Sequence, residues 1–210
     1  TDDTYLSKLE ELCMGIEFTN EETFLLIKLM VYLMDFKSTY TVTHTIHMSY
    51  YAVVLGELFG LSEKELNELF TAGLLHDIGK MAIPNSILES TGKLAPWEYM
   101  LMKKHVIETE DIIKGIVPEK IVNIAVRHHE KLDGSGYPYG LSENDLSLQE
   151  RILACADIFS ALIDERSYKD HLPKSVVISI FKGMVEKHQL DAKICQCLFD
   201  YYEEIWYRCS

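Results

Sequence analysis

Seven histidine and aspartate residues of this chain are candidate metal ligands, because imidazole and carboxylate groups commonly bind metal ions. Each lies on or at the end of a predicted helix. They are His44, the pair His76-Asp77, His105, the pair His128-His129, and Asp157. Imidazole and carboxylate ligands together suit manganese, iron or zinc, and the oxygen ligands favour manganese and iron over copper. Seven ligands exceed the four that one tetrahedral zinc ion needs, so the set predicts two ions that share a bridging carboxylate.

Such a pair of ions would act on phosphate esters. Two divalent ions about 3.5–4 Å apart can clamp a phosphodiester, polarise its oxygens and supply hydroxide at neutral pH. Asp157 stands in the apolar run 152–163, where a carboxylate is costly to bury unless it is paired or bound to metal. A lone histidine near a helix end is more often a cap or a surface residue, which is what we expect of the other three histidines: His47, His171 and His188.

The elements that position these residues are predicted to be helices, because apolar residues recur at helical spacing along nearly the whole chain. Capping-box sequences open three helices, at Thr19-x-x-Glu22, Ser62-x-x-Glu65 and Ser147-x-x-Glu150. Prolines are suited to the first turn of three further helices. These helices are predicted from Pro96 to about Lys114, from Pro118 to 129, and from Pro173 onwards. Pattern and composition therefore indicate an all-α fold.

Composition and charge exclude several classes of function. The 210 residues carry a formal net charge of −13, which argues against a basic nucleic-acid-binding face and against anionic membranes as partners. The longest apolar run, residues 24–34, is too short to span a membrane, and no secretory signal is visible. The five cysteines have no regular spacing and fit reduced thiols of a cytoplasmic protein; they are Cys13, Cys155, Cys195, Cys197 and Cys209.

The spaced histidines and the run His76-Asp77-Ile78-Gly79-Lys80 resemble the HD phosphohydrolase superfamily, and residues 128–138 resemble the signature of its HD-GYP branch. The resemblance, which runs from about Thr43 to about Asp191, implies an HD-domain helical bundle, which we assign to 39–210. From its helical pattern, the segment 1–38 before it is expected to be a linker or dimerisation element. It implies hydrolysis of cyclic di-GMP to linear pGpG, with GMP as a further product, in bacterial signalling. The alternatives are a 3',3'-cyclic GMP-AMP phosphodiesterase and a non-catalytic module that binds cyclic dinucleotide or a diguanylate cyclase.

The resemblance also implies a role for each site residue. One ion would be held by His44, His76, Asp77 and Asp157, and the second by His105, His128 and His129, with Asp77 bridging. Iron or manganese is expected, while zinc and nickel are permitted. Asp77 and Lys80 would be catalytic, and the substrate-binding residues would be Lys80, Arg166, Lys169 and Tyr137. The Gly136-Tyr137-Pro138 loop would be a contact for diguanylate cyclase (GGDEF) proteins, and the N-terminal helices could pair in a homodimer.

The sequence departs from the family pattern at three positions. Some members have a glutamate that helps to hold a third metal, where this chain has Tyr40, so two ions are expected. Val106 and Thr109 stand where many members have proline and glycine. We expect both to be variation on the surface of a helix.

Overall fold

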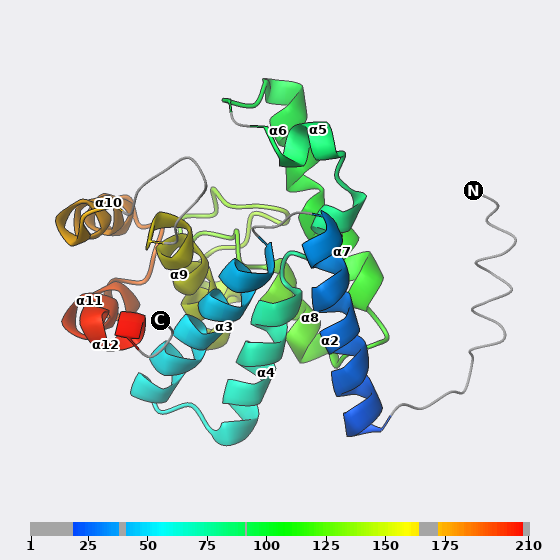
Figure 1. The fold of residues 1–210 in the computed structure, drawn as a ribbon. Helices are drawn as coiled ribbons and strands as arrows, with labels where there is room; N and C mark the ends of the chain where they lie inside the picture. Colours follow the sequence, from blue (N-terminus) through cyan, green and yellow to red (C-terminus); the bar gives the residue numbers. More distant parts are fainter. Residues whose placement is uncertain (1–18, 38–40, 91, 164–171, 208–210) are drawn as a thin grey trace, which may run out of the picture.

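The computed structural model describes residues 19–37, 41–90, 92–163 and 172–207, and every regular element within these ranges is helical (Figure 1). In chain order the elements are α2 (Asn20–Lys37), α3 (Thr41–Leu58), α4 (Glu63–Leu75), the 3₁₀ helix η1 (Ile78–Ala82), α5 (Asn85–Leu88), α6 (Pro96–Lys103), α7 (His105–Ile113), α8 (Glu119–Val126), the 3₁₀ helix η2 (Glu143–Asp145), α9 (Leu148–Ile163), α10 (Lys174–Glu186), α11 (Ala192–Asp200) and α12 (Tyr202–Tyr207). The predicted all-α class is confirmed.

The core forms around α3, which packs against α4 and α9 in the middle of the bundle (Figure 1). The Tyr51 ring of α3 meets the Phe159 ring of α9 nearly edge-on at 5.3 Å, and Phe159 meets Tyr202 of α12 in the same way at 5.2 Å. Edge-to-face pairs at these distances are a favoured aromatic geometry. The C-terminal helices are thereby anchored to the helix that carries Asp157.

The N-terminal helix α2 packs against α3, α4 and η1 and contributes to the same core. Its buried side chains are Ile27, Val31 and Met34, which lie three and four residues apart and so share one face. The predicted capping box at its start is present, because the Thr19 amide donates to Glu22 at 2.8 Å and the Glu22 amide donates to Thr19 Oγ1 at 3.2 Å. The capping boxes at Ser62 and Ser147 are present as well.

The prediction of one continuous helix from Pro96 to about Lys114 is wrong, because in the structure this segment forms two helices that are separated at Lys104. The Lys104 amide donates to the carbonyl of Leu101, three residues back, at 3.1 Å. The side chain of His105 engages the next carbonyl, that of Met102, at 2.7 Å. This tight turn lets α6 leave the bundle, and α5 and α6 project together from its upper end in Figure 1.

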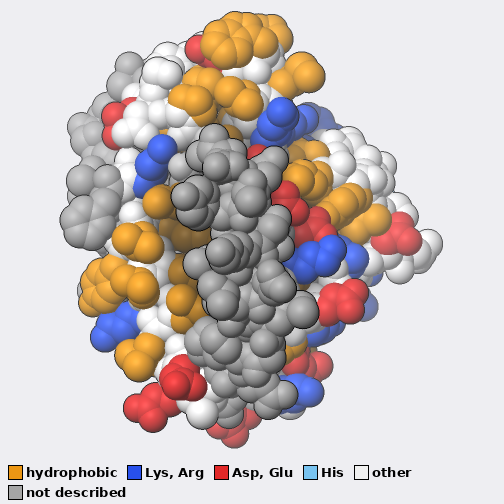
Figure 2. All heavy atoms as spheres, turned by 90° about the vertical axis from the view of Figure 1, so that its right-hand side faces the viewer, with side chains coloured by type: hydrophobic (Ala, Val, Ile, Leu, Met, Phe, Trp, Pro, Cys, Tyr) orange, Lys and Arg blue, Asp and Glu red, His pale blue; other side chains and the backbone are white. Residues whose placement is uncertain are grey.

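Apolar side chains reach the surface on α6 and α2. On α6, where no residue is buried, Trp97 is 62% exposed and Met100 is 71% exposed. On α2, Phe24 and Leu25 are 59% and 57% exposed. Figure 2 shows apolar side chains gathered at the upper end of the molecule, where α6 projects. No helix within the described residues is long and apolar enough to cross a bilayer.

Candidate metal centre

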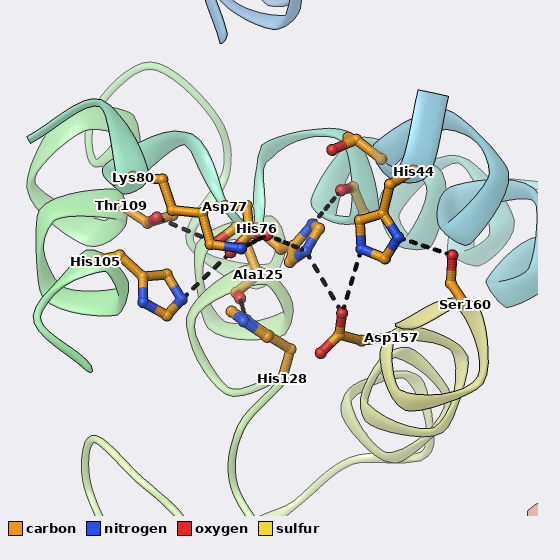
Figure 3. A network of polar contacts seen from close by, with 12 residues as sticks. His44, His76, Asp77, Lys80, His105, Thr109, Ala125, His128, Asp157 and Ser160 are labelled. Carbon is orange, nitrogen blue, oxygen red and sulfur yellow. Dashed lines mark hydrogen bonds and ion pairs between the residues drawn. The ribbon is translucent and has the colours of Figure 1, made fainter. Parts of the chain in front are cut away.

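The seven predicted ligands converge in the middle of the bundle from five separate elements, and all but His129 are labelled in Figure 3. They come from α3, from the end of α4, from the start of α7, from the segment after α8 and from α9. Two groups each have ligand atoms within 4.8 Å of one another: His44, His76 and Asp77 form the first triad, and His105, His128 and His129 form the second. The family resemblance implied the same two groups, with Asp157 added to the first. In the structure Asp157 lies beside both triads.

Three of the imidazoles are oriented by a backbone carbonyl three residues earlier. The Nδ1–carbonyl distances are 2.6 Å for His76 to Gly73, 2.7 Å for His105 to Met102 and 2.6 Å for His128 to Ala125. A carbonyl can only accept, so each Nδ1 carries a proton, and in the neutral ring the Nε2 atom then keeps its lone pair. In the described part of the chain, these three Nε2 atoms are buried and have no hydrogen-bond partner.

Such unpartnered lone pairs fit metal ligation. Histidines that bind metals usually donate their other ring N–H to a carbonyl or carboxylate, which fixes the tautomer and the ring orientation. A buried polar atom without a partner is otherwise unfavourable. The ring of His44 is positioned from another helix, because its Nδ1 lies 3.0 Å from Ser160 Oγ of α9. The donor set of this site can therefore hold metal ions.

Both aspartates face the two triads at once. Asp77 Oδ2 lies 3.1 Å from His76 Nε2, and Asp77 Oδ1 lies 3.3 Å from His105 Nε2. Asp157 Oδ1 lies 3.7 Å from His44 Nε2, whereas its Oδ2 lies 3.9 Å from His129 Nδ1. A carboxylate whose oxygens point to different ligand groups is suited to bridge two ions.

The electrostatics of the site favour the protonation states that metal binding needs. Burial lowers the pKa of His128 well below its usual range and lowers the pKa of His129 to about 4. Burial raises the pKa of Asp77, but the neighbouring His76 and Lys80 outweigh it and hold that pKa well below its usual range. At neutral pH these imidazoles are neutral and the carboxylate is ionised, as metal ligands must be.

Lys80 lies at the rim of the site. Its ammonium pairs with Asp77 Oδ2 from one turn further along, on η1, and its side chain is 27% exposed. A cation in this position can stabilise negative charge that develops on a bound phosphate.

Thr109, which the sequence assigned to a helix surface, is fully buried, and so is Val106. That prediction is wrong, because both residues lie on the face of α7 that packs inwards, against η1 and α8. The Thr109 hydroxyl accepts from the Gly79 amide at 2.9 Å and donates to the His76 carbonyl at 3.1 Å. It therefore ties the segment that carries Asp77 to the helix that carries His105.

The Thr109→Val variant is expected to lower the free energy of unfolding by about 2 kcal/mol, because it leaves a buried amide and a buried carbonyl without partners. Metal affinity should fall by about tenfold, as when groups that orient a ligand are lost. Urea unfolding and metal titration measure the two effects. Thr109→Ser keeps the hydroxyl and should restore metal affinity; equal affinity losses in both variants would contradict the role of the hydroxyl.

The loop that contains Tyr137 is held by the carboxylate of Glu130. This buried side chain accepts from the amides of Tyr139, Gly140 and Leu141 at 2.7, 3.1 and 2.9 Å. Within the loop, the Tyr137 ring lies over the His129 ring, with centroids 4.6 Å apart and planes inclined by 31°. Glu130 was not singled out by sequence, although a carboxylate just after a histidine pair and before a glycine-rich run is a signal for such a role.

Glu130→Gln should loosen this loop, because the amide that replaces one oxygen must face a backbone N–H. A hydrogen bond to a charged group is worth about 1.5–3 kcal/mol, and stability should fall by an amount of this order. Hydrogen exchange of residues 137–141, together with urea unfolding, tests this expectation. Glu89→Gln, at an exposed position, is the matched control; unchanged exchange in the Glu130 variant would count against the role of the carboxylate.

Several predicted residues lie outside the described residues. They are the substrate-binding candidates Arg166 and Lys169, together with Tyr40, His171, Cys13 and Cys209. Among the described cysteines, Cys155, Cys195 and Cys197 are free thiols. The roles given to Arg166 and Lys169 stay predictions.

Comparison with known proteins identifies the fold family. A family model of the HD domain matches residues 28–194, which includes all seven ligand candidates. The chain belongs to the HD domain family. Among solved structures, Bd1817, an HDG"Y"P protein from Bdellovibrio bacteriovorus, has the same fold as this HD domain. Its TM-score is 0.65 at 21% identity, over 88% of this chain and 63% of that chain. The predicted resemblance to the HD superfamily is confirmed.

Curated relatives of this HD domain have names that describe cyclic-dinucleotide hydrolysis. The 3'3'-cGAMP-specific phosphodiesterase 3 of Vibrio cholerae is 38% identical over 71% of this chain and 33% of that protein. The cyclic di-GMP phosphodiesterase response regulator RpfG of Xanthomonas campestris is 44% identical over 59% of this chain and 33% of that protein. The HD domain thus spans about a third of the length of these relatives.

Proposed function

We propose that this chain is a metal-dependent phosphodiesterase that hydrolyses cyclic di-GMP to linear pGpG, with GMP as a further product. The observation that carries the proposal is the pair of triads, each with two buried members, that are spanned by Asp77 and Asp157, with the Lys80 ammonium at the rim. The names of the relatives support a cyclic dinucleotide as the substrate class.

The residues that would hold two divalent ions are His44, His76, Asp77 and Asp157 for one ion and His105, His128 and His129 for the other, with Asp77 between them. Five imidazoles and two carboxylates favour iron or manganese, and permit zinc or nickel. When bound, the ions supply Lewis-acid stabilisation of the phosphodiester oxygens and lower the pKa of water.

The protein's own groups orient the ligands and the substrate. The carbonyls of residues 73, 102 and 125 hold three imidazoles in the ligating tautomer. The Lys80 ammonium, which pairs with Asp77, would turn towards the phosphate and stabilise the negative charge that develops there. Tyr137, stacked on His129, would form one wall of the substrate site, and Arg166 and Lys169 would bind its phosphates.

A second candidate substrate is 3',3'-cyclic GMP-AMP, which is favoured by the name of the Vibrio cholerae relative. The two dinucleotides differ in one base and share the phosphodiester that the metal site would act on. The base-binding side chains therefore decide between them, and a comparison of turnover with both substrates separates the two assignments.

The domain and partner assignments belong to the same proposal. Residues 39–210 would carry the phosphodiesterase domain, and residues 1–38 would form a linker or dimerisation element whose α2 also closes the core. The Gly136-Tyr137-Pro138 loop would be the contact for diguanylate cyclases, and the exposed Tyr139 directly after it supports this role. We also propose a homodimer and a cytoplasmic location, the latter consistent with free thiols.

The test uses protein prepared anaerobically with iron, or with manganese, and assayed for metal content. The same sample is incubated with cyclic di-GMP and, separately, with 3',3'-cyclic GMP-AMP, and the products are separated by chromatography. We expect about two ions per chain, linear product, and loss of activity after chelation. A fully loaded protein that binds either dinucleotide without product would support the non-catalytic module instead.

A further inference from the structure

Lys103, the last residue of α6, has an unusual environment for a lysine in an acidic protein. Its Nζ lies over two aromatic rings, 4.9 Å from the centroid of Tyr99 and 4.7 Å from the centroid of Tyr137. The chain has a net charge of −13, yet within the described residues no carboxylate lies in ion-pair distance of this ammonium. The lysine is half-buried, and its described contacts are with the two rings and not with an acidic partner.

The two rings connect Lys103 to the metal centre. The Tyr137 ring that lies below the ammonium also stacks on His129, a member of the second triad, at 4.6 Å. One residue before Lys103, the Met102 carbonyl orients His105 of the same triad. The last turn of α6 therefore does two things at once, since it fixes one ligand and places a positive charge beside the loop that covers another.

Within the described part of the chain, the ammonium of Lys103 has no hydrogen-bond partner. An ammonium has three N–H donors, and contacts with ring faces satisfy its charge only in part. Holding a long side chain between two rings also costs conformational entropy. A cation with unused donors, positioned beside a metal centre, is suited to an anionic ligand and in particular to a phosphate group.

A cyclic dinucleotide carries two phosphates, on opposite sides of its sugar-phosphate ring. The phosphate under attack would lie at the triads, where Lys80 is the nearby cation. The other phosphate needs positive groups apart from Lys80, and Lys103 would join Arg166 and Lys169, which lie outside the described residues, in that role. We propose that Lys103, held by Tyr99 and Tyr137, binds the phosphate that is not cleaved. This assignment rests on the proposed function and adds a substrate-binding residue to it.

The test compares Lys103→Met with Lys104→Met, because Lys104 is the neighbouring exposed lysine. Metal-loaded variants are assayed with cyclic di-GMP and with bis(p-nitrophenyl) phosphate, which contains a single phosphate. Lys103→Met should raise KM for the dinucleotide by about tenfold or more, as expected for a hydrogen bond to a charged group. KM for the small ester, kcat for both substrates and metal content should stay within twofold of the wild type, and Lys104→Met should match the wild type throughout.

Equilibrium binding of cyclic di-GMP, measured by calorimetry, separates this proposal from the proposed function. If wild-type protein binds the dinucleotide without cleaving it, while Lys103→Met weakens binding by about tenfold, the phosphate assignment stands and the hydrolytic function falls. Unchanged dinucleotide KM and binding in Lys103→Met would overturn the assignment. An equal rise in KM for both substrates would overturn it too, because it would indicate a disturbed metal centre. Absence of both binding and turnover in the wild type would overturn both proposals.

Discussion

Replacing Asp77 with alanine is expected to remove the bound ions and abolish hydrolysis of cyclic dinucleotides. The carboxylate is buried between the triads, with one oxygen 3.1 Å from His76 Nε2 and the other 3.3 Å from His105 Nε2. Asp157 also faces both triads, but its oxygens lie further from the imidazoles, at 3.7 Å from His44 Nε2 and 3.9 Å from His129 Nδ1. Removal of a group that only orients a ligand costs about 10- to 100-fold in metal affinity or activity. Loss of the shared ligand itself should cost more than that.

Elemental analysis and the chromatographic assay, applied to one sample, measure both effects of Asp77→Ala. The control is Asp111→Ala, which removes an exposed carboxylate from α7 and should retain metal and activity. Two ions per chain in the Asp77 variant would refute the bridging role. A variant that keeps one ion but loses activity would assign Asp77 to a single ion and so contradict the bridge as well.

Gly79→Ala should be the most destabilising small change near the site. A Cβ at this position would overlap the carbonyl oxygen of His105 and the amide nitrogen of Thr109, both of which are backbone atoms. Backbone cannot rotate away as a side chain can, so η1 would have to move away from α7. Overpacking of this kind typically costs 1–3 kcal/mol and occasionally more, and we expect about 3 kcal/mol. Because the same movement separates Asp77 from His105, metal affinity should fall together with stability.

Gly183→Ala is the matched control for this change. Gly183 lies within α10, and a Cβ there would meet nothing within 4 Å. Alanine is the better helix former, so this variant should be more stable by about 0.5–1 kcal/mol. Urea unfolding of the two variants in metal-free protein gives the comparison. A Gly79 variant as stable as the wild type would show that the close approach of η1 to α7 is not required.

Local sequence patterns predict much of the fold. The capping boxes at Thr19, Ser62 and Ser147 begin helices where the sequence predicts them, because each motif satisfies its own backbone donors without help from the rest of the chain. The end of α6 was not predictable in this way. Periodicity continues through Lys104, and the turn depends on the His105 side chain engaging the Met102 carbonyl, which no apolar pattern records.

For the site, the residue types and order predicted which side chains would meet, since the seven candidates do lie together. The supporting groups were missed. Thr109 is fully buried, but the sequence assigned it to a helix surface. A difference from the family pattern at one helix position does not show which face of that helix packs inwards. The contacts of Glu130 and Lys103 depend on how the loop of residues 137–141 folds back, which requires tertiary structure.

The repeated bond from a histidine Nδ1 to the carbonyl three residues earlier has a kinetic consequence. Each of these bonds lies within a single turn of chain, so the direction of His76, His105 and His128 is set by secondary structure and does not require an ion. The metal-free chain is therefore preorganised, and ion uptake should require little rearrangement of the protein. Rapid mixing should then give an uptake rate that rises in proportion to ion concentration, with no slow phase from the chain, and reloading after chelation should be complete.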